Sequence, residues 1–299
     1  MQIFLINFVI ILNFYTIGIL FLKNLEFHNF LNKFSLSCVF GAIFVSFLAL
    51  LINFFLPLDK LVGNTFIILS FVFFLVIFYS EKNKIDLIKF TFLSSLIATI
   101  LILYSTINRP DSGLYHLPYI QLINEHKILL GISNIHFRFG HISIIQYLSA
   151  IYNNSFFPIE VIVLPSAIIT GSIFLYFFSF LDRKYDFLEL KIFVSLITIY
   201  SLYSFNRYSG FGNDATSHLL LFLVSIFFLQ NQFQIKNIDY FATTTLISIF
   251  IFMQKTFMIF LPIICFFVYL FFLVKINIYK NLKILFSIIF ILLWIIKNV

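Results

Sequence analysis

A near-continuous series of long apolar runs constrains this chain more than any other feature of its sequence. Runs of about 20 apolar residues match the ~30 Å hydrocarbon core that a helix must cross, and unsatisfied backbone amides cost several kcal/mol each in lipid. The runs are continuous rather than alternating, which excludes a pure β-barrel. The sequence therefore predicts an all-α fold: a polytopic transmembrane helical bundle of about 10 spans, with one large external loop carrying short helices.

Composition supports the same class. Hydrophobic residues make up 62% of the chain and charged residues only 10%, which leaves more apolar surface than a water-soluble fold of this length could bury. We find no tandem repeat and no linker rich in Gly, Pro or Ser. We therefore expect a single integral membrane domain over 1–299.

The expected spans are the apolar runs between polar connections. Run 2–22 is expected to be a retained span, because it lacks the basic start and the cleavage site of a signal peptide. The run from Asp239 to Val274 is split because Lys255 places a cation at its middle. The expected spans are 2–22, 35–57, 62–80, 90–107, 157–181, 192–205, 217–229, 239–253, 257–274 and 284–297.

The Lys and Arg residues of the connections predict the orientation. If the connection after the fourth span is external, twelve of the 19 basic residues lie inside and seven outside, as the positive-inside rule favours. This alternation places 207–214, Lys255 and Lys297 on the same side as Asp111. The polar outliers are thus expected to converge on the outer face of the cytoplasmic (inner) membrane. The net charge of +7 is accounted for by lysines facing anionic lipid, with no nucleic-acid partner.

The polar segment 108–142 holds most of the side chains capable of chemistry. Its basic, acidic and histidine residues are Arg109, Asp111, His116, Glu125, His126, Lys127, His136, Arg138 and His141. The histidines lack the His-Glu-x-x-His pairing or the Cys-rich frame of a zinc site, so any metal ligand would be Asp111. Cys38 and Cys265 lie in apolar runs without a spacing partner and are expected to be buried.

The stretch Asp111-Ser112-x-x-Tyr115-His116-Leu117-Pro118 resembles a motif of bacterial polytopic glycosyltransferase-like proteins of the GT-C superfamily. Those proteins use dolichyl- or undecaprenyl-phosphate sugars and carry the active site in the first large external loop. Weaker resemblances agree in order: Asn213-Asp214, Lys255-Thr256 followed by Pro262, and Trp294 with Lys297-Asn298, which is similar to Trp-x-x-Arg-Asn.

This chain departs from that pattern in three ways. Gly113 stands where bulkier residues are common, Lys297 replaces an arginine, and the sequence stops at position 299, where related proteins usually run on. A transferase truncated at its C-terminus is therefore one expectation.

The resemblance implies transfer of a hexosyl or pentosyl group from a polyprenyl-phosphate-linked sugar to a glycan, lipid or protein acceptor at the membrane. Such a transfer needs a carboxylate that deprotonates the acceptor hydroxyl and cations that stabilise the departing phosphate. On a short helix, Asp111 and Tyr115 share a face with His116 beside them. The catalytic candidates are Asp111 and His116, and the substrate-binding candidates are Tyr115, Arg138, Arg207, Asp214 and Lys255. No cofactor is implied beyond an optional divalent cation.

Structural interpretations of the same residues stay open. Asp111 and Asp214 fit helix caps, His116 fits an interfacial structural residue, and Lys255 fits a side chain that snorkels to the membrane surface. Tyr147 and Tyr152 fit an interfacial aromatic belt.

Two other functional classes also stay open. A noncatalytic membrane assembly or scaffold protein, or a fragment of a split transferase, fits the apparent truncation. A flippase or ion-coupled transporter fits less well, because ion coupling requires carboxylates deep inside spans and only Glu160 approaches the interior of a run.

Overall fold

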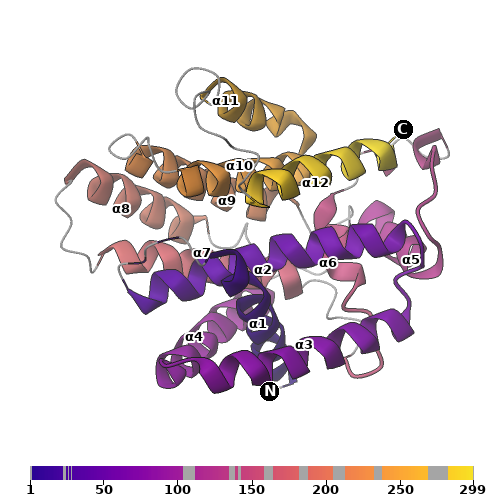
Figure 1. Ribbon diagram of the computed structural model, residues 1–299, viewed down its shortest axis with the longest axis horizontal. Helices are drawn as coiled ribbons and strands as arrows, with labels where there is room; N and C mark the ends of the chain where they lie inside the picture. Colours follow the sequence, from indigo (N-terminus) through magenta and orange to yellow (C-terminus); the bar gives the residue numbers. More distant parts are fainter. Residues whose placement is uncertain are drawn as a thin grey trace.

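All regular secondary structure that the computed structural model describes is helical (Figure 1). The structure describes residues 2–22, 25, 27, 29–103, 112–134, 139–140, 143–157, 164–181, 188–204, 213–231, 238–268 and 282–298. No strand occurs within these ranges, which confirms the all-α prediction.

The helices fall into an N-terminal group, a group of short helices in and after the polar segment, and a C-terminal group. The N-terminal group is α1 (Gln2–Gly18), η1 (Ile19–Leu22), α2 (Phe30–Asn53), α3 (Lys60–Ser80) and α4 (Lys84–Leu103). The short helices are η2 (Ser112–His116), α5 (Leu117–Glu125), η3 (Ile132–Asn134) and α6 (Ile144–Ala150). The C-terminal group is α7 (Leu164–Leu181), α8 (Leu188–Tyr203), α9 (Asn213–Asn231), α10 (Ile238–Gln254), η7 (Thr256–Ile259), α11 (Phe260–Val268) and α12 (Leu282–Asn298).

Four helices are long and apolar enough to cross a bilayer: Gln2–Leu22, Phe30–Asn53, Lys60–Ser80 and Lys84–Leu103. The described parts of the remaining expected spans overlap α7 to α12, and Leu164–Phe180, Thr216–Gln230 and Thr256–Val268 form shorter apolar helices there. The fold is thus that of a membrane protein. The bundle of about 10 spans stays a prediction.

Local capping explains where the structure departs from the expected bounds. Helix α2 begins at Phe30 rather than near 35, because the Asn29 side chain accepts a hydrogen bond from the Asn32 N–H at 2.9 Å. In the same way, the Asp59 carboxylate accepts from the Val62 N–H at 2.9 Å and starts α3. The predicted break at Lys255 is confirmed, since α10 ends at Gln254 and η7 begins at Thr256.

Small residues permit the close crossing of α1 and α2 inside the bundle. A Cβ added to Gly18 would collide with the backbone of Ser37, and one added to Gly41 would collide with the backbone of Phe14. Glycines of this kind let transmembrane helices approach to backbone contact. The core spreads outward from this crossing through buried residues of α4, α6 and α7.

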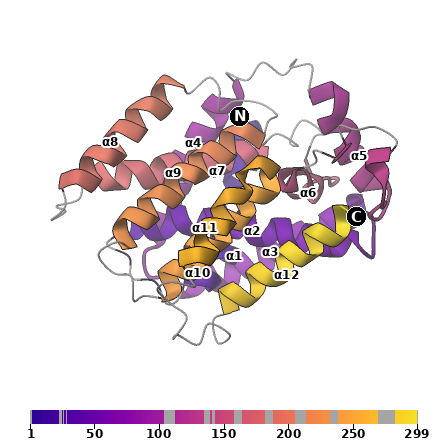
Figure 2. The same ribbon diagram turned by 90° about the horizontal axis from the view of Figure 1, so that it is seen from above.

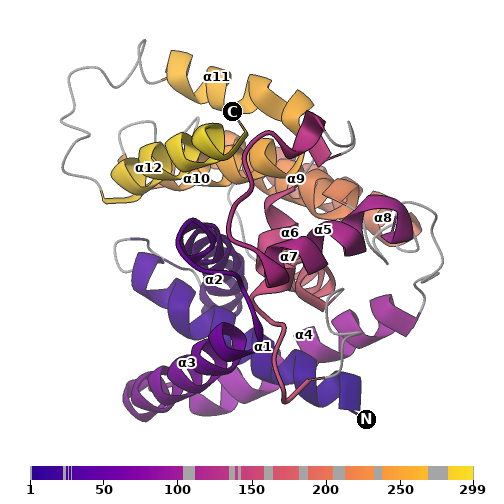
Figure 3. The same cartoon turned by 90° about the vertical axis from the view of Figure 1, so that its right-hand side faces the viewer.

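The first helices and the last helices of the chain lie on opposite sides of the molecule. Helices α1, α3 and α4 occupy one side and α10 to α12 the other, with α5, α6 and α7 between them (Figures 1 and 3). Seen from above, the end of α12 lies on the same side of the molecule as α5 (Figure 2). The end of the chain is thereby brought beside the polar segment.

Candidate functional site

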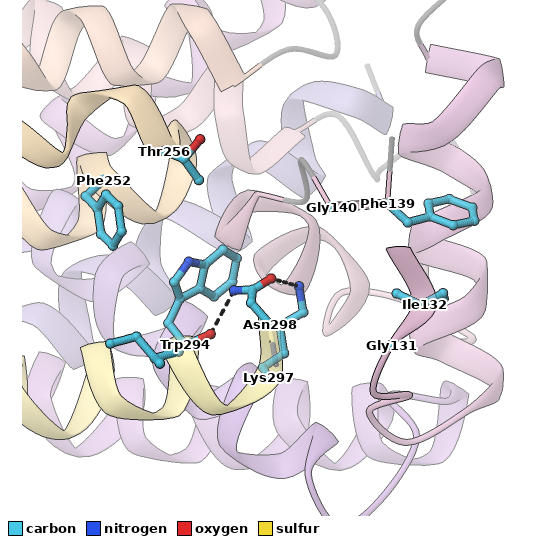
Figure 4. A pocket seen from close by; sticks show the side chains of 10 residues that line it. Gly131, Ile132, Phe139, Gly140, Phe252, Thr256, Trp294, Lys297 and Asn298 are labelled. Atoms are coloured by element: carbon cyan, nitrogen blue, oxygen red, sulfur yellow. Dashed lines mark hydrogen bonds between the residues drawn. The ribbon is translucent and has the colours of Figure 1, made fainter. Parts of the chain in front are cut away.

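A cavity of about 350 Å³ lies where the end of α12 meets the polar segment and the break after α10 (Figure 4). Its wall is made of residues from all three places: Gly131, Ile132, Phe139, Gly140, Phe252, Thr256, Trp294, Ile295, Lys297 and Asn298. The wall is mainly apolar, with the polar groups of Thr256, Lys297 and Asn298 set into it. Three regions that the sequence singled out, far apart along the chain, therefore share one cavity.

The Lys297 ammonium is the charged group of this wall and is almost completely buried, at 4% exposure. It donates to Asn298 Oδ1 at 3.0 Å, and Asn298 Nδ2 in turn donates to the carbonyl of Trp294 at 2.7 Å (Figure 4). The ammonium also lies 4.8, 5.5 and 6.0 Å from the ring centroids of Trp294, Tyr119 and Tyr147. Aromatic faces attract a cation at these distances without neutralising it.

No carboxylate neutralises Lys297 among the described residues. The salt bridges found there join Lys33 to Glu81 and Lys283 to Asp239. A buried cation without an anion is costly, so the surroundings of Lys297 are suited to an anionic ligand.

Two tyrosine rings lie close to this ammonium. The hydroxyls of Tyr119 on α5 and Tyr147 on α6 lie 3.0 Å apart and hydrogen-bond. Burial raises the pKa of Tyr119 and Tyr147 well above the ordinary value, so both stay neutral phenols. The interpretation of Tyr147 and Tyr152 as an interfacial belt is wrong, since both are buried and Tyr147 is only 1% exposed.

His116 closes the π-helical turn η2 and opens α5. Its Nδ1 lies 2.9 Å from Nε2 of Gln146 on α6, and its ring lies 4.2 Å from that of Tyr115. The carboxamide oxygen of Gln146 accepts from the N–H of Ser143 at 2.9 Å, completing a capping box at the start of α6. Through Gln146, the motif helix and α6 are held to each other.

The structure places the predicted site residues unequally. Tyr115 and His116 lie on η2, whereas the ammonium of Lys255 lies 5.0 Å from the Phe257 ring and is not part of the cavity wall, which its neighbour Thr256 lines. Asp111, Arg138 and Arg207 lie outside the described residues, as does the side chain of Asp214 in the first turn of α9.

A metal site is not evident in the part of the chain that the structure describes. No group of three His, Cys, Asp or Glu side chains that could hold a metal ion is found there. Cys38 and Cys265 are both buried and free, as expected.

Sequence reasoning missed Tyr119, Ser143 and Gln146. Tyr119 follows His116 by three positions, which is a helical spacing that places both on one side of α5. Ser143-x-x-Gln146 is the sequence pattern of a capping box and was readable as such. Neither local pattern indicates that Gln146 also reaches His116, because that contact crosses thirty residues.

The model of one protein family, described as a domain of unknown function (DUF8201), matches residues 1–299. No curated protein and no solved structure matches the chain.

Proposed function

This chain belongs to the DUF8201 family, and we propose that it is a membrane glycosyltransferase. It would move a sugar from a polyprenyl-phosphate donor to an acceptor on the outer face of the cytoplasmic membrane. The observation that carries the proposal is the buried Lys297 ammonium, which no carboxylate of the described residues neutralises, in the wall of a cavity that the polar segment also lines.

The charge of the cavity supports a phosphate-bearing ligand. Lys297 uses one donor on Asn298, and an ammonium has three, so two donors make no hydrogen bond within the described part of the chain and suit phosphate oxygens. A phosphate would supply the negative charge that the described surroundings of Lys297 lack. The rings of Trp294, Tyr119 and Tyr147 exclude water around the ammonium, which strengthens its attraction to an anion.

The walls of the cavity support a lipid-linked ligand. Ile132, Phe139, Phe252 and Ile295 give the wall an apolar surface beside the cation. A polyprenyl phosphate combines a charged group with a hydrocarbon chain, and both parts have a matching surface here. A soluble sugar nucleotide would leave the apolar portion of the wall without a matching group.

The resemblance at Asp111-Ser112-x-x-Tyr115-His116-Leu117-Pro118 supplies the chemistry of the transfer. The acceptor hydroxyl oxygen attacks the anomeric carbon of the donor sugar, and its proton passes to the Asp111 carboxylate. The bond from the anomeric carbon to the phosphate oxygen breaks, and its electron pair leaves with the polyprenyl phosphate. Lys297 stabilises the charge that develops on this departing group, and attack from the opposite face inverts the anomeric configuration.

The proposal is tested by profiling glycans and lipid-linked sugars in cells that carry the intact chain or the variants Asp111→Asn and Lys297→Gln. Loss of one glycan species with accumulation of its lipid-phosphate sugar is expected in both variants. Lys60→Gln, which changes an exposed lysine, serves as the matched control and is expected to leave the profile unchanged.

Immunoblots of the membrane fraction establish that the variants are equally abundant. Lys297→Arg preserves the charge and is expected to retain most of the transfer, because related proteins carry arginine at this place in the motif. Unchanged profiles for Asp111→Asn and Lys297→Gln at equal abundance would contradict the proposed transferase.

A further inference from the structure

The contacts of Gln146 determine how His116 is protonated. From them we infer that His116 is held as the neutral imidazole with its proton on Nε2, and that Gln146 is the positioning residue that sets this form. His116 then acts as a hydrogen-bond donor and not as the base of the transfer. Its part in catalysis rests on the proposed function, whereas the tautomer does not.

The orientation of the Gln146 carboxamide is fixed by Ser143. A backbone N–H can only donate, so the group facing the Ser143 N–H at 2.9 Å must be the carboxamide oxygen. The carboxamide nitrogen therefore faces His116. Rotating the carboxamide by half a turn would set its NH₂ against the N–H of Ser143 and break the capping box.

The tautomer of His116 follows from this orientation. The Gln146 Nε2 atom can only donate, so Nδ1 of His116 at 2.9 Å must accept and carries no proton. A neutral imidazole has one N–H, which is then on Nε2. A proton on Nδ1 would set two donors against each other. Water could not relieve that conflict, since His116 is 5% exposed and Gln146 is 3% exposed.

The tautomer of His116 gives different roles to the two catalytic candidates, Asp111 and His116. In this form, the lone pair of Nδ1 is engaged by Gln146, and Nε2 has no lone pair in the ring plane, so His116 cannot take the proton of an acceptor hydroxyl. Within the motif the base is then Asp111. His116 contributes an N–H donor at Nε2 instead of a base.

The tautomer can be measured without any activity, by ¹⁵N NMR of the full chain in nanodiscs with labelled histidine. The signal that disappears in His116→Gln identifies His116. We expect an unprotonated Nδ1 and a protonated Nε2. In Gln146→Glu, a carboxylate faces Nδ1, so the proton is expected to appear there and both ¹⁵N signals to shift.

A transfer assay tests the role of the ring in the same variants. His116→Gln can place an amide N–H near the position of Nε2, so it is expected to lose less activity than His116→Ala. Both variants should keep the acidic limb of the pH–rate profile, because that limb belongs to the carboxylate. The matched control is His126→Gln, which changes an exposed histidine of the same segment and is expected to leave the rate unchanged.

The results for the tautomer of His116 and for the transferase activity can be told apart. A protonated Nδ1 in the intact chain, or ¹⁵N signals indifferent to Gln146→Glu, would overturn the tautomer. Loss of the acidic limb in His116→Gln would overturn the donor role and make His116 the base. If the NMR result is as expected but Asp111→Asn leaves the glycans unchanged, the positioning by Gln146 stands and the transferase fails.

Discussion

Two lysines of this chain line cavities of similar size in opposite electrostatic surroundings. Lys33 borders a cavity of about 400 Å³, where its ammonium lies 3.1 Å from the Glu81 carboxylate. That carboxylate also accepts from the Tyr15 hydroxyl at 2.8 Å. Lys297 borders a cavity of about 350 Å³, where its neighbours among the described residues are an amide and three aromatic rings and no carboxylate.

Only one of the two cavities is suited to an anion. The Lys33 cavity contains its own counter-charge, so an incoming phosphate would have to compete with Glu81. The Lys297 cavity contains a cation that lacks one among the described residues, and a phosphate there would complete the charge balance. Lys33 therefore has a structural role, and the proposed ligand-binding role falls to Lys297.

A carboxylate placed next to Lys297, like the one next to Lys33, should lower activity more than any other change. Asn298→Asp changes the acceptor that already lies 3.0 Å from the ammonium into a charged one. We expect the transfer rate to fall about 100-fold, because the new carboxylate would take the place of the donor phosphate. The rate is measured as transfer of labelled sugar in membranes containing equal amounts of each protein.

Asn298→Ala is the control for this change. It removes the bond from Nδ2 to the Trp294 carbonyl, as the aspartate also does, and it also removes the Oδ1 acceptor of Lys297, but it adds no charge. Its rate is expected to fall clearly less than that of Asn298→Asp, since each of the two lost hydrogen bonds is worth about 1 kcal/mol and no new charge takes the place of the phosphate. If Asn298→Ala lowered the rate as far as Asn298→Asp, the charge argument for this cavity would be wrong.

The converse change removes the carboxylate of Glu81, the partner of Lys33. Glu81→Gln keeps the shape of the side chain but leaves Lys33 without its counter-charge, and we expect the free energy of unfolding to fall by about 1–2 kcal/mol. The estimate is modest because Lys33 is 28% exposed, although Glu81 is 8% exposed. Unfolding in mixed detergent micelles measures this loss, with the exposed Glu189→Gln as the control.

Transfer activity supplies the second half of that test. Because Glu81 lies in the other cavity, Glu81→Gln is expected to leave the rate per folded molecule unchanged. A large loss of transfer with normal stability would reverse the roles that the comparison assigns to the two cavities.

The stability contributed by Glu81 should also depend on pH. Burial acts to raise the pKa of Glu81, but hydrogen bonds from Tyr15, the Asn83 N–H and Lys33, with the charge of Lys33, outweigh it and lower the pKa below 4.5. Since the folded pKa lies below the unfolded one, this stability is fully present above about pH 4.5 and is lost as the pH falls through the folded value. Thermal unfolding of purified protein should show this acid-dependent loss, and Glu81→Gln should lack this part of it.

The helices were predictable because their signals are local. Apolar runs and interruptions such as Lys255 specify where a membrane helix starts and stops, and the caps Asn29 and Asp59 adjust the ends by a few residues. Thr256 and Lys297 line one cavity, whereas the convergence of Asp111 and residues 207–214 with them on the outer face stays a prediction.

The side-chain contacts of the site were not predictable in the same way. An aromatic residue after a polar loop fits an interface or an interior equally well, and only the packing of α6 against α5 and α12 buries Tyr147. In the sequence, Lys255 and Lys297 are both lysines near the end of an apolar run. Of these two, Lys297 lines the cavity, whereas the Lys255 ammonium lies over the Phe257 ring. Sequence specifies the helices, and long-range packing selects which of their polar residues meet.

Two substitutions of Tyr119 test separately the ring near Lys297 and the hydroxyl that bonds to Tyr147, and both should have small effects. Tyr119→Phe keeps the ring that lies 5.5 Å from the ammonium and removes the hydroxyl bonded to Tyr147. The free energy of unfolding should fall by about 1 kcal/mol, because the buried Tyr147 hydroxyl loses that partner. The transfer rate should change less than about three-fold, because cation–π attraction depends on the ring. Tyr119→Leu, which removes the ring as well, should lower the rate further. Equal rates for the phenylalanine and leucine variants would show that the ring contributes nothing to the setting of Lys297, and the contrast with Lys33 would then rest on charge alone.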